Sequence, residues 1–188
     1  TAISNILAEQ NTRAYVVGGL VRDALLGRDT ADIDIAVNTD ALALASKVAT
    51  ALGGTCVILD KVNKVGRVVL PEKGASLGKV TREIDFSSFA GDISGDLARR
   101  DFTIDAMAID LSQLGSASSD IEPIDPFDGQ SDLEQRLVRA VSDEAFTSDA
   151  VRLLRAVRLA AELGFSIDQK TEALIRRSSH LIAAVAGE

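Results

Sequence analysis

Residues 18–35 read GGLVRDALLGRDTADIDI, and the expected fold extends outward from this stretch. A short apolar run at residues 14–17 precedes the two glycines, and apolar residues at helical spacing follow them as far as Gly27. The alternation from Asp32 to Ile35 indicates a strand with both carboxylates on one face and both isoleucines on the other. The stretch therefore predicts a strand, a tight turn, a short helix and a second strand.

The patterns that follow predict a mixed α/β region and then an all-helical one, with the border near Val141. Strands are expected at residues 55–59, 67–70, 80–86, 106–111 and 139–141. Helices are expected after an N-cap at Asp40, ending near residues 53–54, and at residues 96–100, 133–137, 149–163 and 168–186. Loops are expected at residues 71–79 and 115–120.

Composition narrows the class of protein. Hydrophobic residues make up 46% of the 188, but aromatics make up only 4% and Trp is absent, so the core must be aliphatic. The net charge of −8 argues against a stand-alone nucleic-acid binder, which is usually basic. If RNA is a substrate, we expect other parts of the protein to supply most of the grip, or contact to be confined to one end of the strand.

Cys56 is the only cysteine of the sequence and His180 is the only histidine. A disulfide framework is therefore impossible, and a zinc site is nearly excluded. No apolar run approaches the length of a membrane span and no signal peptide is evident, so we expect a cytoplasmic protein with no membrane partner. The chain begins at Thr1 and its one methionine is Met107, so it reads as a fragment, and further domains are expected.

The pair Asp32 and Asp34 is the first candidate site. Side by side on one strand face, the two carboxylates repel each other, and a divalent cation between them would relieve the repulsion. Mg²⁺ prefers oxygen ligands, usually one or two carboxylates plus substrate phosphates, and two metal ions can hold the attacking and leaving oxygens of a phosphoryl displacement. The alternative is a solvated pair at a sheet edge.

Gly18, Gly19 and Arg22 form the second candidate site. Glycines at a strand-to-helix turn let backbone N–H groups approach a phosphate, and Arg22, one turn into the helix, would reach the same phosphate. An ordinary tight turn is the alternative. A third catalytic carboxylate is expected from Glu83 and Asp85, which also alternate on a strand face. We favour Asp85, because it lies near the strand end, with a plain surface charge as an equal alternative.

These motifs resemble those of a known family. Residues 18–35 are similar to the first motif of the bacterial tRNA nucleotidyltransferase (CCA-adding enzyme) and poly(A) polymerase family, the class II branch of the polymerase-β-like nucleotidyltransferases. Four later segments resemble the family's later motifs and occur in the same order: DLARRDFTIDAMA at residues 96–108, DPFDG at 125–129, SDAVRLLRAVR at 148–158 and GF at 164–165.

The resemblance implies an α/β (α+β) fold: a polymerase-β-like head with a five-stranded mixed sheet over residues 1–140, then the start of a helical neck at residues 141–188. Body and tail domains, which hold the tRNA in the family, would lie outside this chain. By the same resemblance, Asp32 and Asp34 hold Mg²⁺. The resemblance also implies that Gly19 and Arg22 contact the triphosphate.

The second motif and the base-reading helix supply the remaining site residues by this resemblance. Arg99, Arg100 and Asp101 would lie near the ribose and phosphates, with a surface salt-bridge cluster as the alternative. Asp149 and Arg152 are the base readers, neighbours at i, i+3 on one helix. The carboxylate would accept from the exocyclic amine of CTP or ATP, and the guanidinium would donate to ring acceptors.

Two further arginines, Arg155 and Arg158, continue at the same spacing and are expected to reach phosphates. The alternative for this helix is an ion pair with two solvated arginines. Three positions depart from the family pattern: Ser148 stands where Glu is usual, Ala150 where Pro is usual, and Asp105 where Asn is common.

One departure is a matter of length. Only ten residues separate Asp85 from Asp96, where the family carries a longer flexible loop implicated in the switch from adding C to adding A. The segment contains Gly91 and Gly95 and is expected to be short but flexible. We therefore expect C addition to be preferred and the terminal A to be added poorly or not at all. The alternative is that the loop at residues 71–79, which contains Gly74 and Gly78, substitutes for the longer one.

These inferences combine into one hypothesis: a Mg²⁺-dependent, template-independent nucleotidyltransferase that adds CMP and/or AMP from NTPs to RNA 3′ ends, most of all those of tRNA, as CCA, CC or A. A poly(A) polymerase is the nearest alternative. Two others are a non-catalytic nucleotide- or RNA-binding module of the same fold and a transferase acting on a small molecule.

Overall fold

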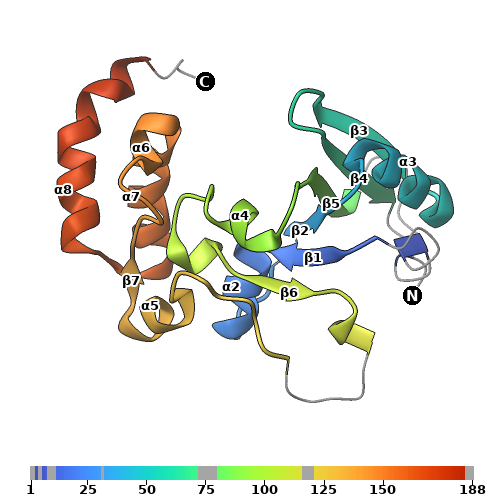
Figure 1. The fold of residues 1–188 in the computed structure, drawn as a ribbon, viewed down its shortest axis with the longest axis horizontal. Helices are drawn as coiled ribbons and strands as arrows, with labels where there is room; N and C mark the ends of the chain where they lie inside the picture. Colours follow the sequence, from blue (N-terminus) through green and yellow to red (C-terminus); the bar gives the residue numbers. More distant parts are fainter. Residues whose placement is uncertain are drawn as a thin grey trace. The chain divides into compact units, whose positions relative to one another are not determined.

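The computed structural model describes residues 3, 6–7, 12–30, 32–71, 80–115 and 121–184. Most of the two expected loops, at residues 72–79 and 116–120, and the end of the last expected helix lie outside the described residues. The chain forms two compact units, which are described separately (Figure 1). Unit 1 comprises residues 1–93 and 108–123, and unit 2 comprises residues 94–107 and 124–188.

Unit 1 is built on a mixed sheet, which has six strands among the described residues, in the order β3-β4-β5-β2-β1-β6. Strands β2 and β5 are parallel, and all other neighbours are antiparallel. The strands are β1 (Ala14–Val17), β2 (Asp32–Val37), β3 (Thr55–Asp60), β4 (Val65–Pro71), β5 (Val80–Ser88) and β6 (Ala108–Asp110). The α/β fold class is confirmed. The expected count of five strands is wrong, because the short β6 pairs with β1 and adds a strand at that edge.

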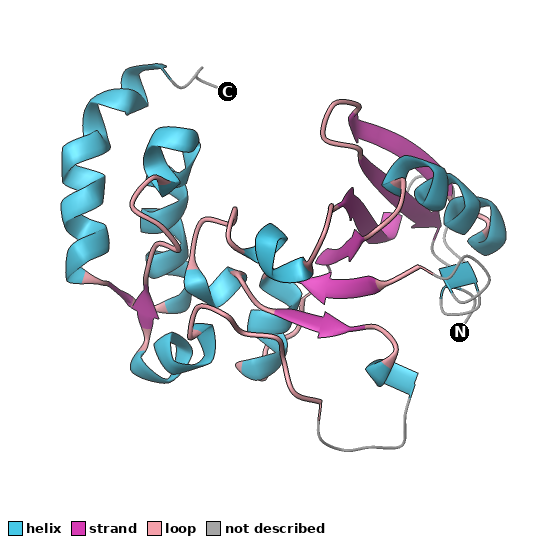
Figure 2. Ribbon diagram, viewed as in Figure 1, coloured by secondary structure: helices cyan, strands magenta, loops and turns pink. Residues whose placement is uncertain are grey.

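Helix α3 (Ala41–Leu52) covers one face of this sheet, against β3, β4 and β5 (Figure 2). The carboxylate of Asp40 caps it by accepting the N–H of Ala43 at 3.0 Å, as predicted. The buried core between helix and sheet is aliphatic apart from one phenylalanine, and includes Ile35, Val37, Leu44, Val48, Val68, Ile84 and Phe86. Because side chains alternate along a strand, the residues between these core positions on β2 and β5 point to the other face.

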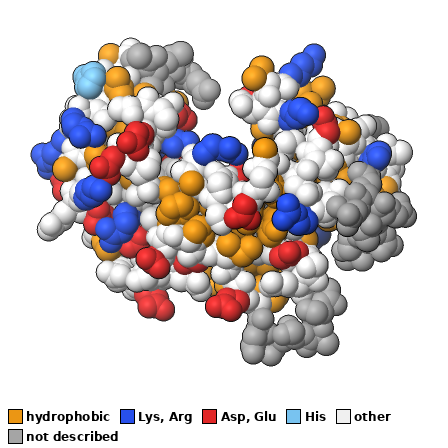
Figure 3. Space-filling view, in the orientation of Figure 1, with side chains coloured by type: hydrophobic (Ala, Val, Ile, Leu, Met, Phe, Trp, Pro, Cys, Tyr) orange, Lys and Arg blue, Asp and Glu red, His pale blue; other side chains and the backbone are white. Residues whose placement is uncertain are grey.

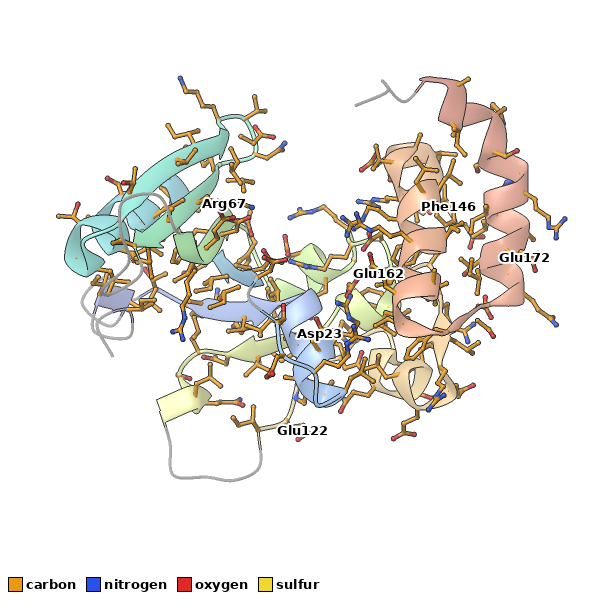
Figure 4. The ribbon with its side chains drawn as sticks, turned by 180° about the vertical axis from the view of Figure 1, so that it is seen from behind. Asp23, Arg67, Glu122, Phe146, Glu162 and Glu172 are labelled. Carbon is orange, nitrogen blue, oxygen red and sulfur yellow. The ribbon has the colours of Figure 1, made fainter. Side chains whose placement is uncertain are left out.

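Unit 2 is mostly helical. Its elements are α5 (Gly129–Gln135), β7 (Leu137–Val138), α6 (Ala145–Ser148), α7 (Val151–Leu163), β8 (Ser166–Ile167) and α8 (Gln169–Ser178), followed by a 3₁₀ helix at Ser179–Ala184. Phe146, labelled in Figure 4, is buried in its core and its ring packs against that of Phe102 at a centroid distance of 6.5 Å. Asp168 caps α8, as predicted, by accepting the N–H of Thr171.

A buried polar network fastens the second sequence motif to the rest of unit 2. Thr103 donates its hydroxyl to Asp132 at 2.7 Å, and Arg139 bridges Asp132 and Asp168. The hydrogen bond to Asp132 is the largest cause that raises the pKa of Arg139 above its ordinary value. The segment after Asp101 is thereby held to α5 and to the start of α8.

Three local predictions in this region are displaced. The helix expected at residues 96–100 is α4 (Ile93–Leu97), because the N–H groups of Arg99 and Arg100 bond three residues back and close a turn instead of continuing the helix. The helix expected at 133–137 is α5. The strand expected at 139–141 is β7, whose partner β8 is parallel and fixes it two residues earlier.

The segment between Asp85 and Asp96 is short, as expected. Its first residues belong to β5 and its last to α4, which leaves residues 89–92 between them. Phe89 is buried, its N–H donates to the carbonyl of Val37, and its ring packs edge-on against Tyr15. The segment is therefore anchored to the sheet.

The DPFDG turn yields a prediction about stability. A Cβ at Gly129 would lie 2.4 Å from the carbonyl oxygen of Thr103, closer than any real contact. We expect Gly129→Ala to lower the free energy of unfolding by about 1–3 kcal/mol, as overpacking does, measured by urea denaturation. Gly95→Ala is the matched control, because its Cβ would meet nothing within 4 Å. Equal stability of the two variants would contradict the close packing.

Candidate functional site

The face of the unit 1 sheet opposite the aliphatic core is acidic. The parallel register of β2 and β5 places Asp32 opposite Glu83 and Asp34 opposite Asp85, so four carboxylates share this face. They line a pocket of about 370 Å³ together with Ile33 and Arg67. The structure thus brings together the three residues predicted as catalytic, Asp32, Asp34 and Asp85, and adds Glu83 beside them.

Arg67, on β4, was missed from the sequence. It lies opposite Asp85 in the β4–β5 register, and its Nε and Nη2 donate to the two carboxylate oxygens at 2.7 and 2.8 Å (Figure 4). The hydrogen bond to Asp85 is the largest cause that raises the pKa of Arg67 above its ordinary value. Only the pairing of two strands reveals this contact, so no local pattern could have found it.

The glycine turn begins beside the acidic pair. Strand β1 pairs antiparallel with β2 so that Val17 lies opposite Asp34, and Gly18 follows immediately. Gly18 has φ 72° and ψ −137°, a conformation that side-chain-bearing residues avoid. The guanidinium of Arg22 lies 3.3 Å from where a Cβ of Gly19 would stand, and it binds the neighbouring carboxylate of Asp23 through two hydrogen bonds.

The donor set of this face fits magnesium. Asp32 and Asp34 supply carboxylate oxygens from alternate positions of β2, and Mg²⁺ commonly takes one or two carboxylates and completes its shell with water and substrate phosphates. Within the described ranges, no group of three or more His, Cys, Asp or Glu side chains is arranged to hold a metal ion.

Two of the predicted nucleotide-binding residues of unit 2, Asp101 and Arg155, contact each other. Asp101 is buried, and it accepts the N–H of Phe102 and the Nε of Arg155, the latter at 2.7 Å. Burial lowers the pKa of Arg155, but the charge of Asp101 and the hydrogen bond to it, together with the charges of Asp105 and Asp149, raise that pKa above its ordinary value. Arg155 therefore holds Asp101 in this structure.

The two arginines before Asp101 meet at Asp96. Arg99 donates to one carboxylate oxygen at 2.8 Å, and Arg100 lies 3.5 Å from the other. Within the described part of the chain, the Nε of Arg100 is the buried side-chain polar atom that lacks a hydrogen-bond partner. A buried donor of this kind is costly to leave unsatisfied, and a ligand oxygen would satisfy it.

The predicted base readers lie side by side on the start of α7. Arg152 Nε is 3.8 Å from Asp149, and Arg152 Nη2 donates to the carbonyl of Arg99 at 2.8 Å. Ser148, which stands where the family has Glu, reaches Arg152 only at 3.5 Å. Arg152 is thus held by a backbone carbonyl. Arg158 pairs at 3.5 Å with Glu162, labelled in Figure 4, and both are exposed.

On the face that Figure 3 shows, basic and acidic side chains of the described residues are interspersed over the helices of unit 2. Among the described residues, no helix is long and apolar enough to cross a membrane.

Comparison with known proteins shows the family. The family described as poly(A) polymerase head domain matches residues 14–139, and the chain belongs to it. The CC-adding tRNA nucleotidyltransferase of Geobacter sulfurreducens is 45% identical over 176 residues, which are 93% of this chain and 38% of that protein. The CCA-adding enzyme of Lactiplantibacillus plantarum is 40% identical, over 93% of this chain and 42% of that protein.

A solved structure agrees. The Thermotoga maritima CCA-adding enzyme, in complex with a tRNA, is 35% identical and matches with a TM-score of 0.82, over 98% of this chain and 42% of that chain. This likeness confirms the polymerase-β-like fold. The chain spans about two fifths of the length of the proteins it matches. Nucleotidyltransferases of this kind generally depend on a divalent metal.

The contact between Arg155 and Asp101 yields the second prediction. Arg155→Gln should leave a buried carboxylate with one fewer charged donor and lower the free energy of unfolding by about 1–3 kcal/mol. Arg158→Gln, one turn further along α7, removes only an exposed pair and should cost at most about 0.5 kcal/mol. Urea denaturation of both variants measures the difference, and a similar loss in both would show that the Asp101 contact contributes nothing special.

Proposed function

We propose that the protein containing this chain transfers nucleotides from CTP and ATP to the 3′ end of tRNA. The observation that carries the proposal is the Asp32–Asp34 pair, which lies in one pocket directly beside the Gly18 turn, in a chain of this family. The relatives named above, which add CC or CCA to tRNA, support tRNA as the acceptor over the growing end of a poly(A) tail.

The proposed chemistry is an in-line displacement, in which the RNA 3′-hydroxyl attacks the α-phosphate and pyrophosphate leaves. Asp32 and Asp34 would hold Mg²⁺, which when bound supplies charge for the attacking and leaving oxygens. The backbone N–H groups at Gly18 and Gly19 would bind the triphosphate, joined by Arg22. Most of the acceleration would come from positioning and from charge stabilisation.

Unit 2 would supply the nucleoside contacts. Asp101, fixed by Arg155, suits a ribose hydroxyl, and Arg99, the unsatisfied Nε of Arg100 and the exposed Arg158 suit phosphate oxygens. Asp149 and Arg152 would read the amine and ring nitrogen that CTP and ATP share. We further propose that the head spans residues 1–140, that the neck starts at residue 141, and that other domains of the protein bind the body of the tRNA.

The first test of this function concerns the metal pair. We expect Asp32→Asn and Asp34→Asn each to lower the rate of CMP addition by the full-length protein about a thousandfold or more, because losing a metal ligand removes several kcal/mol of transition-state stabilisation. Addition to a tRNA that lacks its last three nucleotides is measured with Mg²⁺ as the only metal. Asp29→Asn, on the exposed loop before β2, is the control and should keep full activity. Full activity in either pair variant would remove that residue from the mechanism.

A second test concerns the product. The segment between β5 and α4 is both short and anchored through Phe89, so it offers little freedom to reshape the pocket after two C additions. We expect the full-length protein to add CMP to tRNAs that lack three or two nucleotides, and to add AMP to a tRNA ending in CC at least about tenfold more slowly. UTP and GTP should be poor substrates, and Arg152→Ala should weaken that preference. Rapid addition of AMP to the tRNA ending in CC would refute the product assignment.

A further inference from the structure

Arg67 has no role in the proposed reaction, yet it lines the acidic pocket. The strand registers place Arg67, Asp85 and Asp34 in one row across β4, β5 and β2. Neighbouring strands are about 4.8 Å apart, so Asp85 lies between the guanidinium on one side and a proposed magnesium ligand on the other. Glu83 and Asp32 form the next row on the same face.

The contacts of Arg67 go to the two β5 carboxylates. Two of its nitrogens bind both oxygens of Asp85, and Nη1 pairs with Glu83. A bidentate arginine–carboxylate pair is both stronger and more directional than a single ionic contact. The Arg67 side chain is 34% exposed and that of Asp85 is 23% exposed, so water screens this pair only in part. Asp85 is consequently turned toward β4.

A guanidinium and a divalent cation compete for the same oxygens. Without Arg67, the carboxylate opposite Asp34 would be available to an ion held by β2, and the charge of the pocket would be one unit more negative. Both effects favour tighter metal binding. The positive charge of Arg67 lies only one or two strand spacings from the proposed ion, so its removal strengthens the electrostatic attraction between the pocket and the ion. The charge of Asp32 also contributes to raising the pKa of Arg67, so the arginine lies within electrostatic reach of the β2 pair.

We infer that Arg67 is a positioning residue that holds Asp85 and Glu83 away from the metal, so that Asp32 and Asp34 alone bind it. The ion is then bound weakly until the phosphates of a nucleotide complete its shell, which couples metal binding to substrate binding. The inference rests on the proposed metal site. It gives Asp85 a role different from the one predicted from the sequence: an anchor for Arg67 in place of a third catalytic carboxylate.

The test measures Mn²⁺ binding to the full-length protein by electron paramagnetic resonance, without nucleotide or RNA. Arg67→Gln should bind Mn²⁺ about tenfold more tightly than the unmodified protein. Arg67→Lys keeps the charge and should stay within about threefold of the unmodified protein. The double variant Arg67→Gln, Asp85→Asn removes the pair without changing the net charge, and it should bind Mn²⁺ less tightly than Arg67→Gln, because Asp85 can no longer act as a ligand.

A purely structural ion pair between β4 and β5 predicts something else. Arg67→Gln would then lower the melting temperature and leave the Mn²⁺ affinity unchanged, and that result would overturn the inference. If Arg67→Gln does not fold, the double variant tests the inference instead. A Mn²⁺ affinity of the double variant as low as that of Asp34→Asn would show that Asp85 is a metal ligand, and that result would also overturn the inference.

The same titration separates this inference from the function on which it rests. Asp32→Asn and Asp34→Asn should each abolish Mn²⁺ binding. If they bind Mn²⁺ normally, the proposed metal site is wrong. If they lose binding while Arg67→Gln behaves like the unmodified protein, the metal site holds and only the role of Arg67 is refuted.

Discussion

Repulsion among the carboxylates of β2 and β5 is the constraint on which the site depends. The parallel register sets Asp32 against Glu83 and Asp34 against Asp85, and a shift by one residue would turn these side chains into the core. The apolar face prevents that shift, because Ile35, Ile84 and Phe86 are buried against α3. The core therefore forces the acidic residues together, and positive charge must offset their repulsion: the guanidinium of Arg67 on one side and, by our proposal, magnesium on the other.

Local pattern predicted much of the fold. The alternation of Asp32 to Ile35 gave a strand with one polar face, and Asp40 and Asp168 cap helices as expected. Errors occurred where pairing or turn geometry overrides local preference. Strand β7 is fixed by its partner β8, which is far along the chain, and residues after Leu97 close a turn where the pattern favoured a helix.

The candidate site could be predicted only in part, for the same reason. The residues of the glycine turn and the Asp pair are close in sequence, so their proximity follows from a short strand–turn–helix–strand unit. Arg67 and Asp85 are 18 residues apart, and Arg155 and Asp101 are 54 apart. Such contacts depend on strand order and helix packing, which no short motif encodes. The predicted roles of Asp85 and Arg155 consequently did not include the partners that hold them.

The central claim is that Asp32 and Asp34 together hold the metal on which nucleotide transfer depends. A crystal structure of the full-length protein with Mn²⁺ and a non-hydrolysable CTP analogue tests it most directly, through the anomalous scattering of manganese. We expect an anomalous peak for a manganese ion bound by both carboxylates and by phosphate oxygens of the analogue, with Asp85 still paired to Arg67. A manganese ion bound elsewhere, with neither aspartate as a ligand, would contradict it.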